Sequence, residues 1–597
     1  MKHLLLFLLL LPSFAAAQDG WKTTPVETAN FEATPGNQET IEYLQELDRR
    51  MPEMQLGFYG DSPQSRAMPL VVVSKEGAFT PAAALKTGKP VVMIQNGIHA
   101  GEIDGKDASL MILRDLAMGQ HRELLDKVIL VILPIYNVDG HTRVSPYNRP
   151  NQDGPRQGMG FRTTAAGLDL NRDHLKAASP EAQALMKLVS DWRPHLHVDD
   201  HVTDGVDHDW VLTWSWAEAP QAPLQVDLWL REHMPAVLAA TEKAGHRAGP
   251  YVDLKDGNDP SKGFSSWIGP PRYATGYYPL RNRPSILVEM HSYKPYKQRV
   301  LANREFLLAL LAEVARDPES LIRAVSEAEA ATVALGKPDA KPSTVAVVYE
   351  ESEAADTIRF PVYAHETIIS TATGGPILRY RRGQVQEMEV PWYHRPKVAL
   401  AVPRPRGYLV LPGWPQIEQR LRTHGLHFSR VSETPEGTEL EVETIRVSEP
   451  KFAPRSYQGL HQVEAKVERR TERRPIPNGA IWIPADQPDF AIAVQLFEPE
   501  APDSLLSWGL LSSVFEQKEY IDTRVLEELA AEMIKDPKTA AEFQEAMKDE
   551  KLAKDPFARY QWWYRRTPYW DETIGLLPVY RVMRVMQAPK FRMEPGR

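Results

Sequence analysis

Histidine and acidic side chains follow several apolar runs of this chain, at the points where buried strands are expected to end. The stretch "QNGIHAGEIDG" comes after the run "PVVMI" and holds His99 and Glu102, three residues apart. Later, "HLHV" leads into "DDHVTDG" with His201, and "SILV" leads directly into Glu289. A catalytic zinc site needs three protein ligands, an open position for water and a carboxylate that takes the water's proton. The first pair alone is a weak signal, but the four residues together predict such a site.

Composition limits the kind of metal site and the kind of partner. The chain contains no cysteine, so disulfides and thiolate sites are excluded and any metal must be held by His, Asp or Glu. The 43% of hydrophobic and 25% of charged residues are typical of a soluble globular protein. The net charge of -9 argues against nucleic acid as a general partner.

The elements that would position these residues alternate along the first half of the chain. Helical patterns lie between the apolar runs, as in "SPEAQALMKLVSDW", where Ser179 is the expected N-cap and Pro180 the first helical residue. This alternation predicts an α/β fold with a mixed, mostly parallel sheet and helices on both faces. Ligand sites of such sheets lie beyond the carboxyl ends of the strands. Runs rich in Val, Ile and Leu predict strands at residues 70–74, 90–95, 128–136, 195–198, 210–216 and 285–290.

The chain is predicted to divide at "GKPDAKPS", a polar linker rich in Gly and Pro over residues 336–343. The predicted catalytic domain covers residues 18–335. Beyond the linker, short strands with frequent Pro and Gly predict a β-rich accessory domain over residues 344–503. Helical patterns return in a C-terminal region over residues 504–597.

The N-terminus has the pattern of a signal peptide over residues 1–17. A basic start is followed by an apolar run too short to span a bilayer and by small residues that end at Ala17. We expect export to the periplasm or the extracellular space and cleavage after Ala17. An uncleaved anchor is disfavoured because Gln18 and Asp19 follow directly, and no later run of the sequence is long and apolar enough to span a membrane.

The order of these motifs resembles that of the zinc carboxypeptidase family, of the carboxypeptidase A/B type. The family signature is H-x-x-E, a later Asn-Arg dipeptide, a further His and a distal catalytic Glu. The turn "NVDG" is also similar to the family's N-P-D-G, and the resemblance, to an exported bacterial member, covers roughly residues 60–330. The matching residues of this chain are His99, Glu102, Asn171, Arg172 within "GLDLNR", His201 and Glu289.

The resemblance implies a carboxypeptidase-like fold and one zinc ion as cofactor. His99, Glu102 and His201 would bind this Zn²⁺. Glu289 would be the general base that takes a proton from the zinc-activated water and then the acid that protonates the leaving amine. The resemblance of these four residues to the family signature therefore implies metal-assisted hydrolysis.

The same resemblance assigns roles to the residues around the metal. Asn171 and Arg172 would hold the terminal carboxylate of the substrate, because a guanidinium can bind both carboxylate oxygens. Asp169 would orient His99. Arg162, in "GFRTTAAG", is the favoured residue for polarising the scissile carbonyl.

Other residues compete for some of these roles. An Asp two residues before the third ligand recurs in the family and favours His201, which Asp199 precedes in this way. Asp173 stands where the family often has Asn. The remaining competitors are His195 and His197 as third ligand, Arg143, Arg149 and Arg156 as the arginine, and Tyr273, Tyr277 and Tyr278 as the family's mobile-loop tyrosine.

The implied activity is hydrolysis of C-terminal peptide bonds, with a peptide that carries a free C-terminal carboxylate as the partner. One alternative is a zinc-dependent deacylase or amidohydrolase of N-acyl amino acids, and another is a carboxypeptidase of cell-wall stem peptides. A non-catalytic binding protein is disfavoured because no ligand position is replaced. Neither the preferred C-terminal residue nor the oligomeric state is determined by the sequence.

Overall fold

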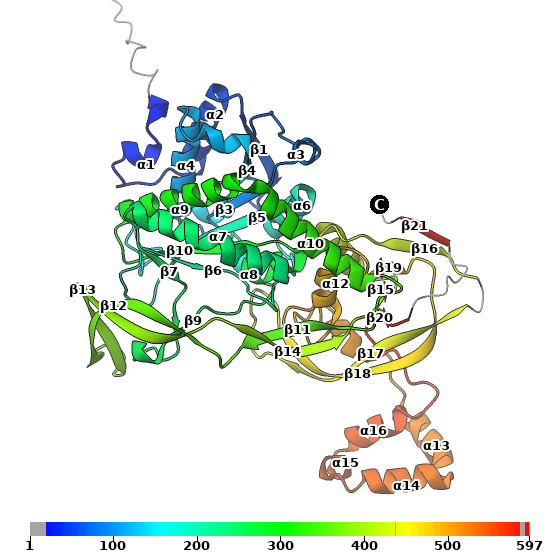
Figure 1. The fold of residues 1–597 in the computed structure, drawn as a ribbon. Coiled ribbons are helices and arrows are strands. Elements are labelled where there is room, and N and C mark those ends of the chain that lie inside the picture. Colours follow the sequence, from blue (N-terminus) through cyan, green and yellow to red (C-terminus); the bar gives the residue numbers. More distant parts are fainter. Residues whose placement is uncertain (1–19, 436–437, 585–591, 596–597) are drawn as a thin grey trace, which may run out of the picture.

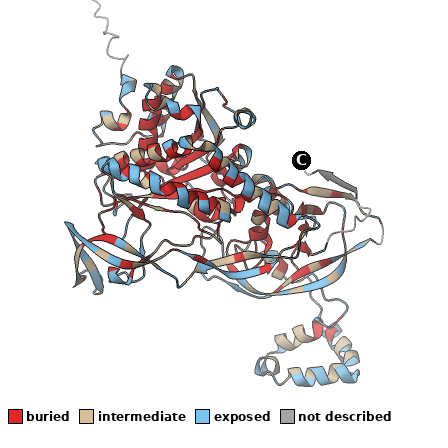
Figure 2. Ribbon diagram, in the orientation of Figure 1, coloured by how far each residue is buried: buried red, intermediate tan, exposed pale blue. Residues whose placement is uncertain are grey.

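The computed structural model describes residues 20–435, 438–584 and 592–595 (Figure 1). The predicted signal peptide, residues 1–17, lies outside the described residues. Buried residues concentrate in the layers of the first half of the chain, whereas the long hairpins and the outlying helices are largely exposed (Figure 2). Among the described residues, no helix is both long and apolar enough to cross a membrane.

A mixed sheet forms the centre of the first half, as predicted. Its strands are β1 (Met54–Asp61), β2 (Ala67–Val73), β3 (Val91–Asn96), β4 (Ile129–Leu133), β5 (Leu196–Thr203), β6 (Leu212–Ser215), β7 (Ala248–Pro250) and β10 (Ser285–His291). They lie in the order β1-β2-β4-β3-β5-β10-β6-β7. The central strands β4, β3, β5 and β10 pair in parallel, while β2 and β6 are antiparallel to their neighbours β4 and β10. The parallel strands carry their carboxyl ends to one edge.

Helices cover both faces of this sheet (Figure 1). One face packs against α2 (Asn37–Arg50), α4 (Asp104–Ala117), α7 (Leu224–Lys243), α9 (Tyr296–Arg316) and α10 (Pro318–Gly336). The other face packs against α6 (Pro180–Trp192). The predicted start of α6 is confirmed, since Pro180 is its first residue and Ser179 Oγ accepts a hydrogen bond from the backbone N–H of Ala182, with an N–O distance of 3.1 Å.

The second half of the chain is rich in β-structure. Its strands are β11 (Thr344–Glu351), β12 (Asp356–Ile369), β13 (Pro376–Tyr393), β14 (Pro396–Pro403), β15 (Gly407–Val410), β16 (Ser429–Glu433), β17 (Glu439–Phe452), β18 (Val463–Pro475), β19 (Ile481–Pro484), β20 (Val579–Val582) and β21 (Arg592–Pro595). β11 pairs with β14, and the largest of these sheets has the order β18-β17-β20-β15-β19-β16-β21. β12 and β13 form a long hairpin that is joined by β9 (Phe264–Ser265) and β8 (Asp253–Leu254) from the first half. The last two strands, which lie in the predicted C-terminal helical region, therefore return to the sheet.

The helices of the second half fall into two groups. α11 (Pro415–Thr423) and α12 (Phe490–Phe497) lie against the body of the protein. The other group is α13 (Thr523–Met533), α14 (Pro537–Ala546), α15 (Glu550–Lys554) and α16 (Pro556–Tyr564), which project away from the body (Figure 1). Leu526, Trp563 and Tyr564 form a small separate core there, so aromatic residues of "RYQWWYRR" fill this projection.

Hydrophobic packing crosses the predicted borders between the domains. The borders themselves stay a prediction. α10 ends at Gly336 and β11 begins at Thr344, on either side of the predicted linker. A continuous hydrophobic cluster nevertheless contains Leu185 of α6, Ile417 of α11 and Phe490 of α12. The β-rich part is therefore packed onto the catalytic part and can contribute residues to it.

Candidate metal centre

His99 and Glu102 lie in the turn that joins β3 to α4, at the carboxyl end of a central strand. Glycine is required in this turn for two reasons. Gly97 has a φ of +67°, in the left-handed region that favours glycine. A Cβ on Gly101 would lie 2.6 Å from the carbonyl oxygen of Gly160. The glycines of "NGIHAG" thus permit the close turn that presents the His and the Glu together.

His201 and Glu289 come from neighbouring parallel strands. β5 and β10 pair in a register that places His201 opposite Glu289. β3 flanks β5 on its other side, so the turn with His99 begins at the same edge of the sheet. This shared edge explains why residues far apart in the sequence meet.

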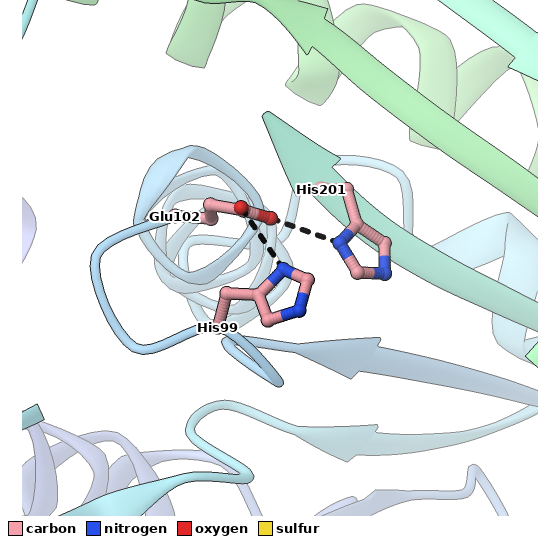
Figure 3. A group of neighbouring side chains, drawn as sticks. All are labelled: His99, Glu102 and His201. Atoms are coloured by element: carbon pink, nitrogen blue, oxygen red, sulfur yellow. Dashed lines mark hydrogen bonds and ion pairs between the residues drawn. The ribbon is translucent and has the colours of Figure 1, made fainter. Parts of the chain in front are cut away.

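The side chains of His99, Glu102 and His201 converge at this edge (Figure 3). The carboxylate of Glu102 lies between the two imidazoles, with Oε1 3.0 Å from Nδ1 of His99 and Oε2 2.9 Å from Nδ1 of His201. One potential ligand atom from each residue lies within 4.8 Å of the others, and all three side chains are buried. The structure therefore brings the three predicted ligands together in the donor set of a catalytic zinc site.

A carboxylate lies behind each imidazole. Nε2 of His99 is 3.0 Å from Oδ1 of Asp169, and Nε2 of His201 is 3.0 Å from Oδ2 of Asp199. Such contacts fix the ring orientation and leave Nδ1 for a metal. Burial opposes the charge on Asp169, but the hydrogen bond to His99 and the positive charge of Arg162 outweigh it and hold the pKa of this carboxyl below its usual range. The arrangement fits a bound zinc ion.

Glu289 faces the same space from β10. Burial raises the pKa of its carboxyl group to about 8 despite the nearby His201, and the carboxylates of Glu102 and Asp199 act in the same direction as burial. Its Oε2 is buried without a hydrogen-bond partner among the described residues. A carboxyl group with an uncommitted oxygen and a raised pKa is suited to proton transfer near neutral pH.

Most of the predicted site residues line one cavity of about 590 Å³. Asp169 is not part of its lining and instead lies behind His99. The other predicted site residues all line it, namely His99, Glu102, Arg162, Asn171, Arg172, His201 and Glu289.

Comparison with known proteins agrees with this arrangement. Residues 40–206 match the family model described as zinc carboxypeptidase. The chain therefore carries a segment of the zinc carboxypeptidase family over these residues. It is accordingly a metallocarboxypeptidase, a hydrolase whose cofactor is one zinc ion.

Two proteins similar to this chain are named carboxypeptidases. "Carboxypeptidase 2" of Trichophyton rubrum is 25% identical over 509 residues, which cover 80% of this chain and 84% of the relative. "Carboxypeptidase 2" of Trichophyton tonsurans is 24% identical over 454 residues, which cover 70% of this chain and 74% of the relative. Among solved structures, carboxypeptidase A from Helicoverpa armigera is 17% identical with a TM-score of 0.35, covering 50% of this chain and 75% of its own.

Two arginines lie near the three predicted metal ligands. The predicted one, Arg162, donates from Nε to Oδ2 of Asp169 at 3.0 Å and lies 3.8 Å from Glu102. Arg149 is closer to that ligand, with Nη2 2.8 Å from Oε1 of Glu102. Both arginines line the cavity, whereas Arg143 and Arg156, the remaining competitors of this loop, are not part of its lining.

Asn171 and Arg172 form the other end of the cavity. Oδ1 of Asn171 is buried and has no hydrogen-bond partner among the residues that the structure describes. The guanidinium of Arg172 lies over the ring of Tyr273, 4.3 Å from its centroid, and its Nη1 is 3.8 Å from Asp169. Nε of Arg172 donates to the hydroxyl of Tyr457 at 2.9 Å. This end therefore offers a cation and an uncommitted amide to a substrate.

Most of the alternative candidates for these roles interact with other side chains or with the backbone outside the cavity. Asp173 pairs with Lys176 at 2.5 Å and accepts a hydrogen bond from the backbone of Ser179, so its carboxylate is used outside the cavity. The ring of His197 is stacked on Tyr278 at 3.7 Å. Of the competing residues outside the arginine loop, His195, His197, Tyr277 and Tyr278 are not part of the lining, whereas Tyr273 is.

Some residues at the site were not anticipated from the sequence. Tyr251 lines the cavity from the connection between β7 and β8, and no local pattern marks it. Tyr457 and Gln458 contact Arg172 and Asp169 from the β-rich part of the chain. Contacts of this kind depend on packing between distant segments.

Proposed function

We propose that this enzyme removes C-terminal residues from peptides. One observation carries the proposal: the guanidinium of Arg172 and the side-chain amide of Asn171, both of which carry N–H donors, line the same cavity as His99, Glu102 and His201. A guanidinium binds a terminal carboxylate strongly because the interaction is charge-assisted and can involve both oxygens. A peptide held in this way has its last peptide bond directed toward the metal-binding residues.

Glu289 moves the proton in this proposal. His99, Glu102 and His201 would hold the zinc ion, which would supply Lewis acidity for the scissile carbonyl and for water. Oε2 of Glu289 accepts a proton from the attacking water and later returns it to the amine of the leaving residue. Burial raises the pKa of this carboxyl, which favours the protonated form needed in the second step.

Arg162 stabilises the negative charge that develops on the carbonyl oxygen. Its guanidinium is held by Asp169, which also contacts His99, so the arginine is oriented before substrate binds. A positioned cation at that point contributes most where charge increases during the reaction. Arg149 is the alternative, because it lies closer to Glu102.

Export is part of the proposal. The signal-peptide pattern of residues 1–17 supports secretion to the periplasm or the extracellular space, with cleavage after Ala17. Peptides of the surroundings and cell-wall stem peptides are both accessible there. Sequencing the N-terminus of the protein recovered from its native source tests this point, and the expected first residue is Gln18.

Substrate choice tests the catalytic part of the proposal. The zinc-loaded enzyme is assayed on a blocked dipeptide, an N-acyl amino acid and a cell-wall stem peptide. We expect cleavage of the last peptide bond of the blocked dipeptide. Selective cleavage of the N-acyl amino acid would instead identify a deacylase and overturn the proposal. Preference for the stem peptide would retain the carboxypeptidase chemistry and narrow its substrate.

A further inference from the structure

A hairpin of the β-rich part reaches the wall of the catalytic cavity. Residues 453–462 join β17 to β18, and their tip contacts the segment that carries the proposed carboxylate clamp. The hydroxyl of Tyr457 accepts a hydrogen bond from Nε of Arg172 at 2.9 Å. Oε1 of Gln458 accepts one from the backbone N–H of Asp169 at 2.8 Å. The tip therefore holds both the clamp and the backbone of the carboxylate that contacts His99.

The tip is a tight turn with an unfavourable residue in it. Tyr457 and Leu460 exchange backbone hydrogen bonds with N–O distances of 2.8 and 3.1 Å. The two residues between them have positive φ, +53° for Gln458 and +75° for Gly459, as in a type I′ turn. Asn, Asp or Gly is the usual first central residue of such a turn, whereas Gln carries a steric cost there. A strained position that makes a specific contact at an active site suggests a functional role.

An aromatic and cationic stack holds the turn in place. The ring of Tyr457 lies parallel to that of Trp508, with a centroid distance of 5.8 Å and an interplanar angle of 9°. Trp508 is fully buried, and the guanidinium of Arg272 lies 5.1 Å from its centroid. Asp503 pairs with this guanidinium at 2.8 Å. Because the ring of Tyr457 is packed, its hydroxyl is a fixed acceptor for Arg172.

We propose that Tyr457 and Gln458 are positioning residues for the carboxylate end of the cavity. Tyr457 holds the guanidinium of Arg172, and Gln458 holds the backbone at the start of the turn that carries Asn171 and Arg172. The inference rests on the proposed function, because it assumes that Arg172 binds the carboxylate of the substrate. The β-rich part then completes the substrate site and is more than a separate binding module.

The nearby Asp169 explains why the guanidinium needs to be held. Its carboxylate lies 3.8 Å from Nη1 of Arg172 and already pairs with Arg162. Without the hydroxyl of Tyr457, the guanidinium keeps the carbonyl oxygen of Asn171 and the ring of Tyr273 as partners, and it can shift toward the carboxylate of Asp169 and away from the substrate. Loss of this hydroxyl therefore weakens binding of the substrate's free carboxylate and leaves the proton transfer by Glu289 unaffected.

Tyr457→Phe tests this role, because it keeps the stacked ring and removes only the hydroxyl. In the full-length zinc-loaded enzyme, we expect KM for a blocked dipeptide to rise roughly 3- to 10-fold while kcat changes less than about twofold. Tyr520→Phe is the matched control, because Tyr520 is 80% exposed and precedes the outlying helix α13. An unchanged KM in Tyr457→Phe would overturn the role of the hydroxyl.

Gln458→Gly separates function from stability. Glycine relieves the positive φ and deletes the side chain that contacts Asp169, so we expect an equal or higher Tm together with a KM raised roughly 3- to 10-fold. Glu449→Gly is the matched control, since Glu449 has a φ of +51° on the same hairpin and is exposed. A variant with unchanged KM would show that the turn is only structural.

Arg172→Met distinguishes failure of this inference from failure of the proposed function. If Arg172→Met leaves KM unchanged, the carboxylate clamp itself is wrong. If Arg172→Met raises KM but neither tip variant does, only the positioning role is wrong. In the double variant, Tyr457→Phe should add nothing to Arg172→Met, because both act through one guanidinium.

Discussion

The two ends of the catalytic cavity are built in different ways. At the metal end, His99, Glu102 and His201 come from the edge of the central sheet, and their supporting contacts involve residues of the same half of the chain. At the other end, Arg172 is held by Tyr457, 285 residues further along the chain. The predicted metal ligands thus come from one half of the chain, whereas the proposed carboxylate clamp is held by packing between two parts of the protein.

Removing a metal ligand should have the largest effect. We expect His201→Ala to lose bound zinc and, with it, essentially all peptidase activity, because two protein ligands are too few for a stable catalytic site. Zinc content by atomic absorption and hydrolysis of a blocked dipeptide measure both consequences. Chelation of the wild type should have the same effect and should be reversed by added zinc. Full activity in a zinc-free variant would contradict the account.

Changing the proton carrier should have the next largest effect. Glu289→Gln keeps the size of the side chain but cannot accept a proton, so kcat should fall roughly 10²- to 10⁴-fold. Bound zinc should be retained, which separates this variant from the ligand variants. If kcat is unchanged, another residue moves the proton.

Replacing Arg162, the arginine beside the predicted metal ligands, should have the third largest effect on activity. We expect Arg162→Met to lower kcat roughly 10²-fold, because it removes a cation from the place where negative charge develops. Arg149→Met is measured in parallel, and a smaller effect there would support Arg162. The reverse order would transfer the role to Arg149.

Variants at the carboxylate end should have smaller effects, and these should fall on binding. Arg172→Met should raise KM for peptides with a free carboxylate roughly 10- to 100-fold, since a charge-assisted hydrogen-bonding partner is lost. Arg156→Met, at an exposed arginine of the neighbouring loop, is the control and should leave KM unchanged. A fall in kcat with constant KM would place Arg172 in the chemical step instead.

The metal end could be predicted from the sequence because its signals are local. Each residue follows an apolar run, and parallel strands carry such residues to a common edge. The predicted strands coincide with β2, β3, β4, β5, β6 and β10, although β5 extends to Thr203 and so contains His201 itself. The order of the motifs along the chain then resembled that of a known family.

The carboxylate end could be predicted only in part. Asn171 and Arg172 form a recognisable dipeptide, but nothing near Tyr457 or Gln458 indicates that this turn packs against them. Such contacts follow from a hydrophobic core that runs across the predicted linker, which composition alone does not reveal. Similarly, the pairing of β20 with β15 joins segments separated by the outlying helices.

One comparison of substrates tests most directly whether a metal site and a carboxylate clamp share this cavity. Initial rates of the zinc-loaded wild type are measured on a blocked dipeptide and on the same dipeptide with a C-terminal amide. We expect the free acid to be cleaved at least roughly 10-fold faster at low substrate concentration, because only it can pair with Arg172. Equal rates, or faster cleavage of the amide, would contradict this expectation.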